Sequence, residues 1–434
     1  MQSRIEQVTI RAGHLPYGIG TLTPGWYLLI SVLLVMFGFG LFAYSQQLTH
    51  GEIVTGMRDI GPMGGATWGL YITFVVYFVG VSFAGITTAV MIRLLNLEHL
   101  RPISRIAELL TVISLVLAAF SVLVDLGQPL QGLLNLPRYA RPGSPFFGTF
   151  TLVVSGYLFA SLVYLYLDGR KDAAQCVGKG GRLNGFYRLW AAGYRDSVAE
   201  RDRRSKASFW LGIAILPLLV TAHSTLGFVF GLQVGRPGWY SALQAPSFVV
   251  MAGVSGVGLL IVIAAVLRRA LGERERLNMQ VFRSLGNFLM LLTITYLYLM
   301  VVELLTSVYA GPRHENQIAS TLLTGDYAWL FWISAMSLFS TFALLFGQYV
   351  LHRYNLSLIV LSGILANIAA IGKRYLIVVP SQTHGTLLPY VTGSYQPTWV
   401  EYGVILGLFA LGVLLYALFI KVFPIIEIPG TERR

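Results

Sequence analysis

A few ionisable residues interrupt the long apolar stretches of this chain, and five of them fall toward the same end of their stretches. A charge inside a membrane is costly unless it is paired or hydrated, so an acid or base retained there is a candidate for function. An acid, an imidazole and hydrogen-bond donors at one membrane interface suit the oxidation or reduction of a quinone, because protons move together with the electrons. The five residues are Asp125, His223, Glu303, Lys373 and Arg374.

His223 and Asp125 are the first candidates for this chemistry. An imidazole titrates near neutral pH, so His223 can donate to a quinone carbonyl or accept a proton from a quinol hydroxyl. Asp125 can then take the proton onward, with Glu303, Lys373 and Arg374 as second-rank members of the site. Two structural alternatives stay open. His223 can instead bond a Ser or Thr of a neighbouring helix, and Asp125 can instead cap a helix or form an ion pair at its end.

A second set of polar residues lies along the stretch that ends at Asp125. Glu108 falls near the start of that stretch, and Thr111, Ser114 and Ser121 follow on roughly the same face as Asp125. Together with trapped water, these residues form a hypothetical proton path from Glu108 to Asp125. The alternative is that small polar residues let helices pack closely and hydrogen-bond to one another.

The composition is that of an integral membrane protein. Of the 434 residues, 55% are hydrophobic and 12% are charged, against about 25% charged in soluble domains. The single cysteine, Cys176, excludes an internal disulfide and a Cys-ligated zinc or iron-sulfur site. A transmembrane haem held by two histidines is also excluded, because only His223 lies well inside an apolar stretch. The sequence therefore predicts no haem or metal bound by this chain, and electrons must leave through a partner.

Ten apolar stretches are each long enough to cross a hydrocarbon core about 30 Å thick, which predicts an all-α membrane domain over residues 24–423. Residues 1–23 precede it, residues 168–206 form a basic loop within it, and residues 424–434 form a tail. Spans 3 and 7 end in an acid and spans 5 and 9 carry a base, which favours two four-helix units, spans 2–5 and 6–9, related as a repeat and flanked by spans 1 and 10. The predicted spans are 24–46, 67–92, 104–125, 145–167, 207–230, 244–267, 280–303, 326–350, 355–379 and 398–420.

Basic residues fall mostly on one side of this topology. If the spans alternate, all but seven of the 31 Lys and Arg residues lie on the side that holds both termini, so both termini are expected in the cytoplasm. The net charge of +12 then meets anionic lipid and requires no nucleic acid. The opposite loops are nearly uncharged and rich in Gly, Pro and aromatic residues, which predicts a docking surface there; the alternative is that their Trp and Tyr residues anchor the helices at the lipid headgroups. The seven exceptions are Arg58, Arg138, Arg141, Arg236, Arg313, Lys373 and Arg374.

Several separated motifs occur in order along the chain: Trp68-Gly-Leu-Tyr-Ile72, Arg101-Pro-Ile-Ser-Arg-Ile-Ala-Glu108, Asp125-Leu-Gly-Gln-Pro129, His223-Ser-Thr-Leu-Gly227, Pro237-Gly-Trp-Tyr240, Lys373-Arg-Tyr-Leu-Ile-Val-Val-Pro380 and Pro397-Thr-Trp-Val-Glu401. In this order they resemble the ten-helix branch of the NrfD/PsrC family, the quinone-interacting membrane subunits of polysulfide-reductase-type complexes. Asp125 matches the acid of the family's D-L-G-R-P motif, and Glu108 matches the acid that opens the third helix. Gln128 stands where Arg is common, and Phe83 stands where alternative complex III members tend to have His.

The resemblance implies a subunit that binds menaquinone or ubiquinone near the periplasmic face and has no redox metal of its own. It also implies a docked iron-sulfur subunit, with a catalytic molybdopterin, hydrogenase or cytochrome c subunit, in the inner membrane of a prokaryotic cell. Members of the family have been proposed to move protons between the cytoplasm and the quinone site. The hypothetical path from Glu108 would serve that purpose.

Two other functions stay open from the sequence. A secondary transporter also has about ten helices, a repeat and buried charges, but its site tends to lie at the midplane beside broken helices. Pro217 and the stretch from Gly253 to Gly258 are the candidates for such breaks. A passive anchor of a periplasmic oxidoreductase would use the charges structurally. Substitution of His223 separates these interpretations, because an anchor should tolerate it and a quinone site should not.

Overall fold

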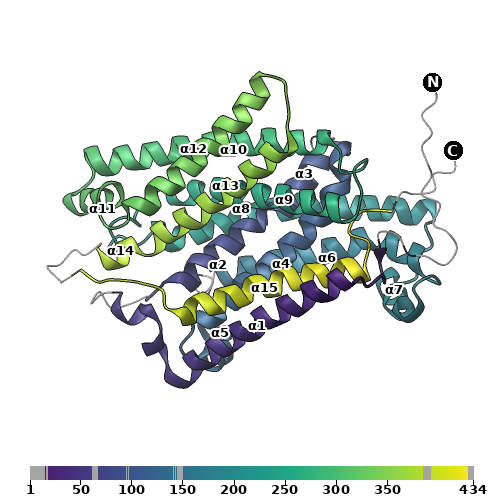
Figure 1. The fold of residues 1–434 in the computed structure, drawn as a ribbon, viewed down its shortest axis with the longest axis horizontal. Helices are drawn as coiled ribbons and strands as arrows, with labels where there is room; N and C mark the ends of the chain where they lie inside the picture. Colours follow the sequence, from purple (N-terminus) through teal and green to yellow (C-terminus); the bar gives the residue numbers. More distant parts are fainter. Residues whose placement is uncertain are drawn as a thin grey trace.

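Long helices run side by side along the longest axis of the molecule in a computed structural model (Figure 1). The structure describes residue 15 and residues 18–60, 67–93, 95, 97–139, 141, 143, 150–384 and 392–428. No strand occurs among these residues, and the all-α prediction is confirmed. Most of the predicted segment 1–23 and the last part of the predicted tail 424–434 lie outside the described residues.

Within the described residues, nine helices are long and apolar enough to cross a membrane. The remaining predicted span, 67–92, is not one continuous helix: α2 (Leu70–Val81) ends just before Ser82, and α3 (Phe83–Arg93) begins just after it. The fourth span is described from residue 150, and its predicted first residues, 145–149, lie outside the described part. The nine helices are α1 (Pro24–His50), α4 (Arg101–Asp125), α6 (Phe150–Cys176), α8 (Val198–Gly231), α9 (Gln244–Ala270), α10 (Met279–Leu305), α12 (Ala328–Val350), α13 (Leu356–Val378) and α15 (Trp399–Val422).

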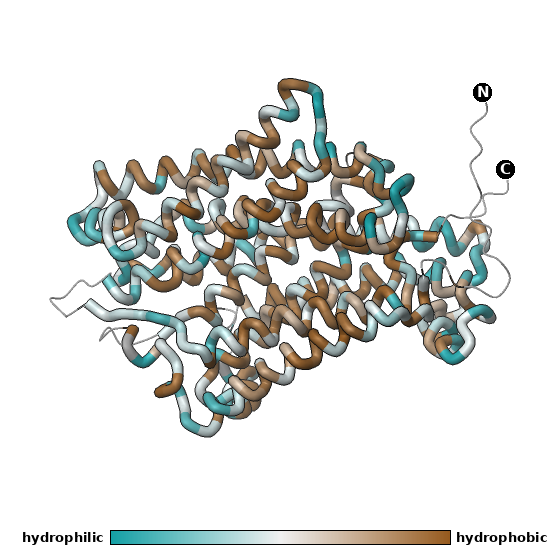
Figure 2. Tube along the Cα trace, viewed as in Figure 1, coloured by the Kyte–Doolittle hydropathy of each residue, from teal (hydrophilic) through white to brown (hydrophobic). Residues whose placement is uncertain are grey.

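Shorter helices lie at the two ends of the bundle, and hydrophilic residues gather at the same ends (Figures 1 and 2). We call the end that holds both termini the basic end and the opposite one the far end. The predicted loop 168–206 at the basic end is mostly helical, because α6 extends to Cys176 and α8 begins at Val198. The far-end helices are α5 (Pro129–Tyr139), α11 (Arg313–Leu323) and α14 (Pro380–Thr383), and the basic-end helix is α7 (Asn184–Ala191); single turns lie at η2 (Glu52–Val54), η3 (Gly56–Asp59), η4 (Glu98–Leu100) and η6 (Gly181–Leu183), and η7 (Thr306–Ala310) is a π-helix.

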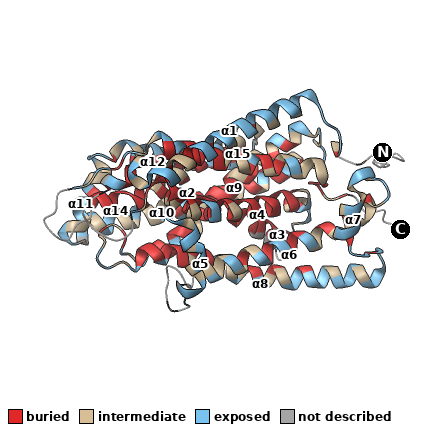
Figure 3. Ribbon diagram, turned by 90° about the horizontal axis from the view of Figure 1, so that it is seen from below, coloured by how far each residue is buried: buried red, intermediate tan, exposed pale blue. Residues whose placement is uncertain are grey.

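Two four-helix units make up the core, as the sequence predicted. The first unit contains the pair α2 and α3 with α4, α6 and α8, and the second contains α9, α10, α12 and α13. The units meet where α9 packs on α2 and α8, and where α13 packs on α2. Buried residues gather along α2, α4 and α9, whereas α1 is largely exposed on the outside (Figure 3). The exposed apolar face of α1 suits contact with lipid.

α1 and α15 form a flanking pair that packs against the first unit through α4. Glycines permit their close approach, since a Cβ on Gly40 would lie 2.6 Å from the Gly407 Cα. Small residues let membrane helices approach closely enough for main-chain contact. The last turn of α1 reaches the end of α4 at the far end, where Gln47 Nε2 donates to the carbonyl oxygen of Val124, next to Asp125.

Candidate functional site

The interruption between α2 and α3 frees main-chain carbonyl groups, and neighbouring helices satisfy them. The Ser82 carbonyl oxygen accepts hydrogen bonds from the hydroxyls of Thr111 (2.7 Å) and Tyr157 (2.7 Å). The Thr111 hydroxyl in turn accepts from the Gly85 N–H (3.0 Å). Residues of α4 and α6 therefore hold the break in place, and Thr111 of the predicted proton path takes part in it.

His223 belongs to the same break. Its Nε2 lies 2.9 Å from the Val79 carbonyl oxygen on α2, and its Nδ1 lies 2.7 Å from the Leu219 carbonyl oxygen one turn earlier in α8. A neutral imidazole carries one N–H, so it donates to one of these carbonyls at a time. The ring is 1% exposed and meets the Phe83 ring edge-on. The sequence left open a bond from His223 to a neighbouring helix, and the structure contains one, made to a carbonyl instead of a hydroxyl.

Asp125, the last residue of α4, has different surroundings. Among the described residues, no hydrogen bond or ion pair reaches its carboxylate, and Oδ1 is buried. The charges of Glu52 and Glu401 act on it. Within the described residues, Asp125 neither caps a helix nor forms an ion pair, the two structural roles considered for it from the sequence. The structure therefore leaves an acid at the far end with its hydrogen-bonding capacity unused.

A polar chain of side chains lies beside this acid. The Tyr71 hydroxyl donates to Gln47 Oε1 (2.7 Å), and Gln47 Nε2 donates to Glu52 Oε1 (2.9 Å) and to the Val124 carbonyl oxygen (2.9 Å). Burial raises the pKa of the Glu52 carboxyl, and the charge of Glu401 raises it further. Sequence analysis missed Tyr71, Gln47 and Glu52, since no spacing links the end of the first span to the end of the third.

Glu401 has a structural position in the first turn of α15. Its carboxylate accepts hydrogen bonds from the Gly56 N–H (2.8 Å), the Thr398 N–H (2.9 Å) and the Tyr395 hydroxyl. The Leu70 N–H donates to the same Tyr395 hydroxyl (2.6 Å). Glu401, the acid of the Pro397–Glu401 motif, thus fastens the far-end loops to the starts of α2 and α15.

Two other predicted site residues, Glu303 and Lys373, line one cavity at the far end of the second unit, together with Glu315. Gln244 Nε2 donates to Glu303 Oε1 (3.2 Å), and the Gly238 N–H donates to Glu315 Oε2 (2.8 Å). Arg374 turns elsewhere: its guanidinium lies 4.3 Å from the centre of the Phe248 ring, and Nη2 donates to the Phe248 carbonyl oxygen (3.3 Å). The structure therefore brings Glu303 and Lys373 to the walls of one cavity, without an ion pair between them, and gives Asp125, His223 and Arg374 separate neighbours.

The other residues of the predicted path, Glu108, Ser114 and Ser121, are all buried in α4. Glu108 Oε1 accepts from the Ser104 hydroxyl (2.9 Å), and the Ser121 hydroxyl donates to the Leu117 carbonyl oxygen (2.9 Å). Hydroxyls that already donate to carbonyls still have lone pairs that can accept from water. Proton movement along α4 stays a prediction.

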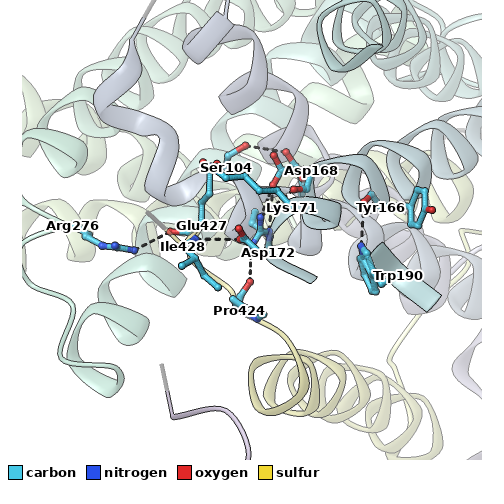
Figure 4. A network of polar contacts seen from close by, with 12 residues as sticks. Ser104, Tyr166, Asp168, Lys171, Asp172, Trp190, Arg276, Pro424, Glu427 and Ile428 are labelled. Atoms are coloured by element: carbon cyan, nitrogen blue, oxygen red, sulfur yellow. Dashed lines mark hydrogen bonds and ion pairs between the residues drawn. The ribbon is translucent and has the colours of Figure 1, made fainter. Parts of the chain in front are cut away.

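An ion network lies at the basic end, beside a cavity that Ser104, Arg105 and Asp168 line (Figure 4). Arg105 of α4 is 1% exposed and forms ion pairs with Asp168 (2.9 Å) and Asp172 (2.6 Å) of α6. It also donates to the Pro424 carbonyl oxygen (2.8 Å), and the Ile428 N–H donates to Asp172 (3.2 Å). The segment after α15 is thereby fastened across the start of α4, on the side away from Asp125.

Comparison with known proteins identifies the family of this chain. A family model described as polysulphide reductase, NrfD, matches residues 60–385. The chain belongs to the NrfD family. This NrfD chain is 30% identical to the putative dimethyl sulfoxide reductase membrane subunit of Halobacterium salinarum, a similarity that covers 94% of this chain and 92% of that protein.

Two further relatives extend the same similarity. The NrfD chain is 25% identical to a selenate reductase subunit of Mesobacillus selenatarsenatis, over 85% of this chain and 88% of that one. It is 23% identical to the Hdr-like menaquinol oxidoreductase integral membrane subunit of Archaeoglobus fulgidus, over 94% of this chain and 95% of that one. The predicted family is confirmed, and the chain is a membrane subunit of a respiratory oxidoreductase complex.

Proposed function

We propose that this NrfD subunit binds menaquinone or ubiquinone at the far end, beside Asp125, and exchanges its electrons with a docked iron-sulfur subunit. The observation that carries the proposal is the Asp125 carboxylate, whose Oδ1 is buried and which has no hydrogen-bond or ion-pair partner among the described residues. An unpaired buried acid is costly and is retained in membrane helices mainly for function. One relative, the archaeal subunit, is named for menaquinol.

The residues around Asp125 suit proton transfer. A quinone, when bound, supplies two-electron chemistry that is coupled to two protons. Asp125 is placed to accept a proton from a hydroxyl group, and Glu52 is a second acid beside it. Because burial raises the pKa of Glu52, this carboxyl holds a proton more readily than an exposed one and can return it. The Tyr71 and Gln47 pair fixes the position of Glu52.

The composition of the two ends of the bundle supports the proposed partner and orientation. The far-end loops carry few charges and would receive an iron-sulfur subunit, with a catalytic subunit beyond it, on the periplasmic side. The basic end would face the cytoplasm, with Glu108 as a proton entry. A secondary transporter is the weaker alternative for a chain of this family, whereas a passive anchor stays the rival to be tested.

The experiment is quinol-analogue turnover by the purified complex, with assembly measured for each variant. Asp125→Asn should assemble and lose turnover by about 100-fold or more, because a positioned acid or base contributes that much. Asp326→Asn is the matched control, since that side chain is 82% exposed at the far end. Normal turnover by Asp125→Asn would refute the site.

His223→Ala is measured in the same series. We expect poor assembly or low thermal stability, because the Val79 carbonyl oxygen loses a donor from α8. If His223→Ala assembles fully and loses turnover while Asp125→Asn does not, the quinone lies at His223. If both assemble and turn over normally, the subunit is an anchor.

A further inference from the structure

A cavity of about 260 Å³ lies at the basic end, lined by residues of α4, α6 and α8. A single buried water needs only about 10–15 Å³, so the cavity has room for a small polar group. Its walls include Ser104 where the apolar part of α4 begins, Asp168 where that of α6 ends, and Ser208 where that of α8 begins. The cavity therefore lies at the depth where the hydrocarbon core ends and the lipid headgroups begin.

The α8 wall of this cavity presents unused donors. Arg204, Ser205 and Ser208 lie within four residues of one another, and Arg204 and Ser208 are neighbours on one face of the helix. Within the part of the chain that the structure describes, no ion pair or hydrogen bond reaches the Arg204 guanidinium, and neither serine hydroxyl is bonded. Guanidinium and hydroxyl donors are groups with which proteins bind phosphate.

Other walls of the cavity present unused acceptors. Asp168 Oδ2 accepts from Arg105, whereas Asp168 Oδ1 has no partner among the described residues. Glu427 Oε1 lies 3.9 Å from the Lys171 ammonium nitrogen, which is too long for a hydrogen bond. An ammonium group has three N–H donors that carboxylate oxygens of this kind can accept.

The charges around the cavity are balanced, which decides the class of ligand. A purely anionic ligand would place its charge beside carboxylates, and a purely cationic ligand would place its charge beside guanidinium groups. A zwitterion can place each of its charges beside the opposite one. The charged lining residues are Arg101, Arg105 and Arg204 against Glu98, Asp168 and Glu427.

Apolar residues show where lipid reaches the cavity. Ile92 and Phe209 line it, and Phe209 is 39% exposed. Trp210, the next residue of α8, is 66% exposed. Exposed aromatic side chains at this depth are typical of the boundary between water and lipid. Acyl chains can therefore lie along α8 while the headgroup of the same lipid occupies the cavity.

We propose that this cavity binds the headgroup of a phosphatidylethanolamine lipid from the leaflet at the basic end. Arg204 and the serine hydroxyls donate to the phosphate, and Asp168 and Glu427 accept from the ammonium group. A phosphatidylcholine headgroup carries the same charges but has no N–H donor, so it satisfies only the phosphate half of the site. The site lies at the end opposite Asp125 and does not depend on the quinone function proposed above.

The test is native mass spectrometry of the purified, delipidated complex, titrated with palmitoyl-oleoyl lipids that differ only in headgroup. Wild type should bind one phosphatidylethanolamine about tenfold more tightly than phosphatidylcholine or phosphatidylglycerol, the effect of a charged hydrogen bond. Arg204→Gln should weaken phosphatidylethanolamine and phosphatidylcholine alike, by about tenfold, because both place a phosphate there. Glu427→Gln should weaken phosphatidylethanolamine alone.

Matched controls make the same chemical changes outside the cavity. Arg203 and Glu275 are exposed at the basic end and do not line it, so Arg203→Gln and Glu275→Gln should bind as wild type does. Ser205→Trp fills the cavity from an exposed position without changing a charge and should remove the site.

Each result bears on the assignment. Equal affinity for the three lipids, unchanged in Arg204→Gln and in Ser205→Trp, would refute the cavity as a lipid site. Tightest binding of phosphatidylglycerol, lost in Arg204→Gln, would make it a site for anionic lipid and overturn the zwitterion. Glycerophosphoethanolamine has the headgroup without acyl chains and should not displace the lipid at the same concentration. If it does, the ligand is a soluble phosphoethanolamine compound and the lipid assignment fails.

Discussion

An ionisable side chain in a membrane helix becomes informative once its partners are known. His223 and Arg374 contact main-chain carbonyl oxygens, and Glu401 accepts three hydrogen bonds, so their polar groups are used in holding the fold. Asp125 and Lys373 have no such partners among the described residues. The free-energy cost of burying a polar group without partners therefore separates these residues. His223, Arg374 and Glu401 stabilise the packing and need no ligand, whereas Asp125 and Lys373 are candidates to bind one.

Glu52 gives a prediction at this scale. Burial, and then the charge of Glu401, raises the pKa of its carboxyl in the folded protein. The stability from such an acid is complete below its unfolded pKa, about 4.3, and is lost as pH rises through the folded value. A glutamine at this position stays neutral at every pH. Glu52→Gln should therefore have a higher midpoint of thermal unfolding than wild type near pH 8, and this difference should disappear toward pH 4. Glu98→Gln is the control. A difference in midpoint between Glu52→Gln and wild type that does not change with pH would contradict the raised pKa of Glu52.

The sequence was most informative about the helices. Apolar length predicted ten crossing spans, because burial in lipid requires about 20 apolar residues. Among the described residues nine of them are helices long enough to cross, and the tenth is interrupted. The break at Ser82 was missed, because the flanking residues are as apolar as those of an unbroken helix. Its carbonyl groups are satisfied by Thr111, Tyr157 and His223, which lie on other helices. Hydropathy does not predict hydrogen bonds between helices that are distant in the sequence. His223 could therefore be selected from the sequence, but its neighbours could not.

Packing between α1 and α15 gives a prediction for helices. A Cβ on Gly40 would lie 2.6 Å from the Gly407 Cα, whereas a Cβ on Gly38 would meet nothing within 4 Å. Gly40→Ala should push the two helices apart and destabilise the protein by about 1–3 kcal/mol, the usual cost of overpacking. Gly38→Ala makes the same chemical change on the same helix and should be neutral. Equal midpoints of thermal unfolding in the two variants would show that the close approach is not tight.

The whole molecule divides its polar groups between two ends. At the basic end, Arg105 is paired with Asp168 and Asp172, whereas at the far end Asp125 and Lys373 have no ion pair or hydrogen bond within the described part of the chain. The sequence predicted which end carries the candidate site from depth alone. It could not show that Asp125 and Lys373 fall in different four-helix units with separate surroundings, because that follows from how the units pack. The two ends therefore differ in how their charges are paired, and the proposed reaction lies at the end where they are unpaired.

Substitution of Asp172 tests the role of the ion network at the basic end. It is fully buried and joins α4, α6 and the segment after α15, through the ion pair with Arg105 and the hydrogen bond from the Ile428 N–H. Asp172→Asn leaves Arg105 with Asp168 alone and should cost about 3 kcal/mol, as when one partner of a buried pair is removed. Asp168→Asn makes the same change where the side chain is 17% exposed, and should cost less. Thermal unfolding in detergent measures both. Because the network lies far from Asp125, quinol turnover per assembled complex should stay at the wild-type value in each, and a selective loss of turnover in Asp172→Asn would instead tie the basic end to the reaction.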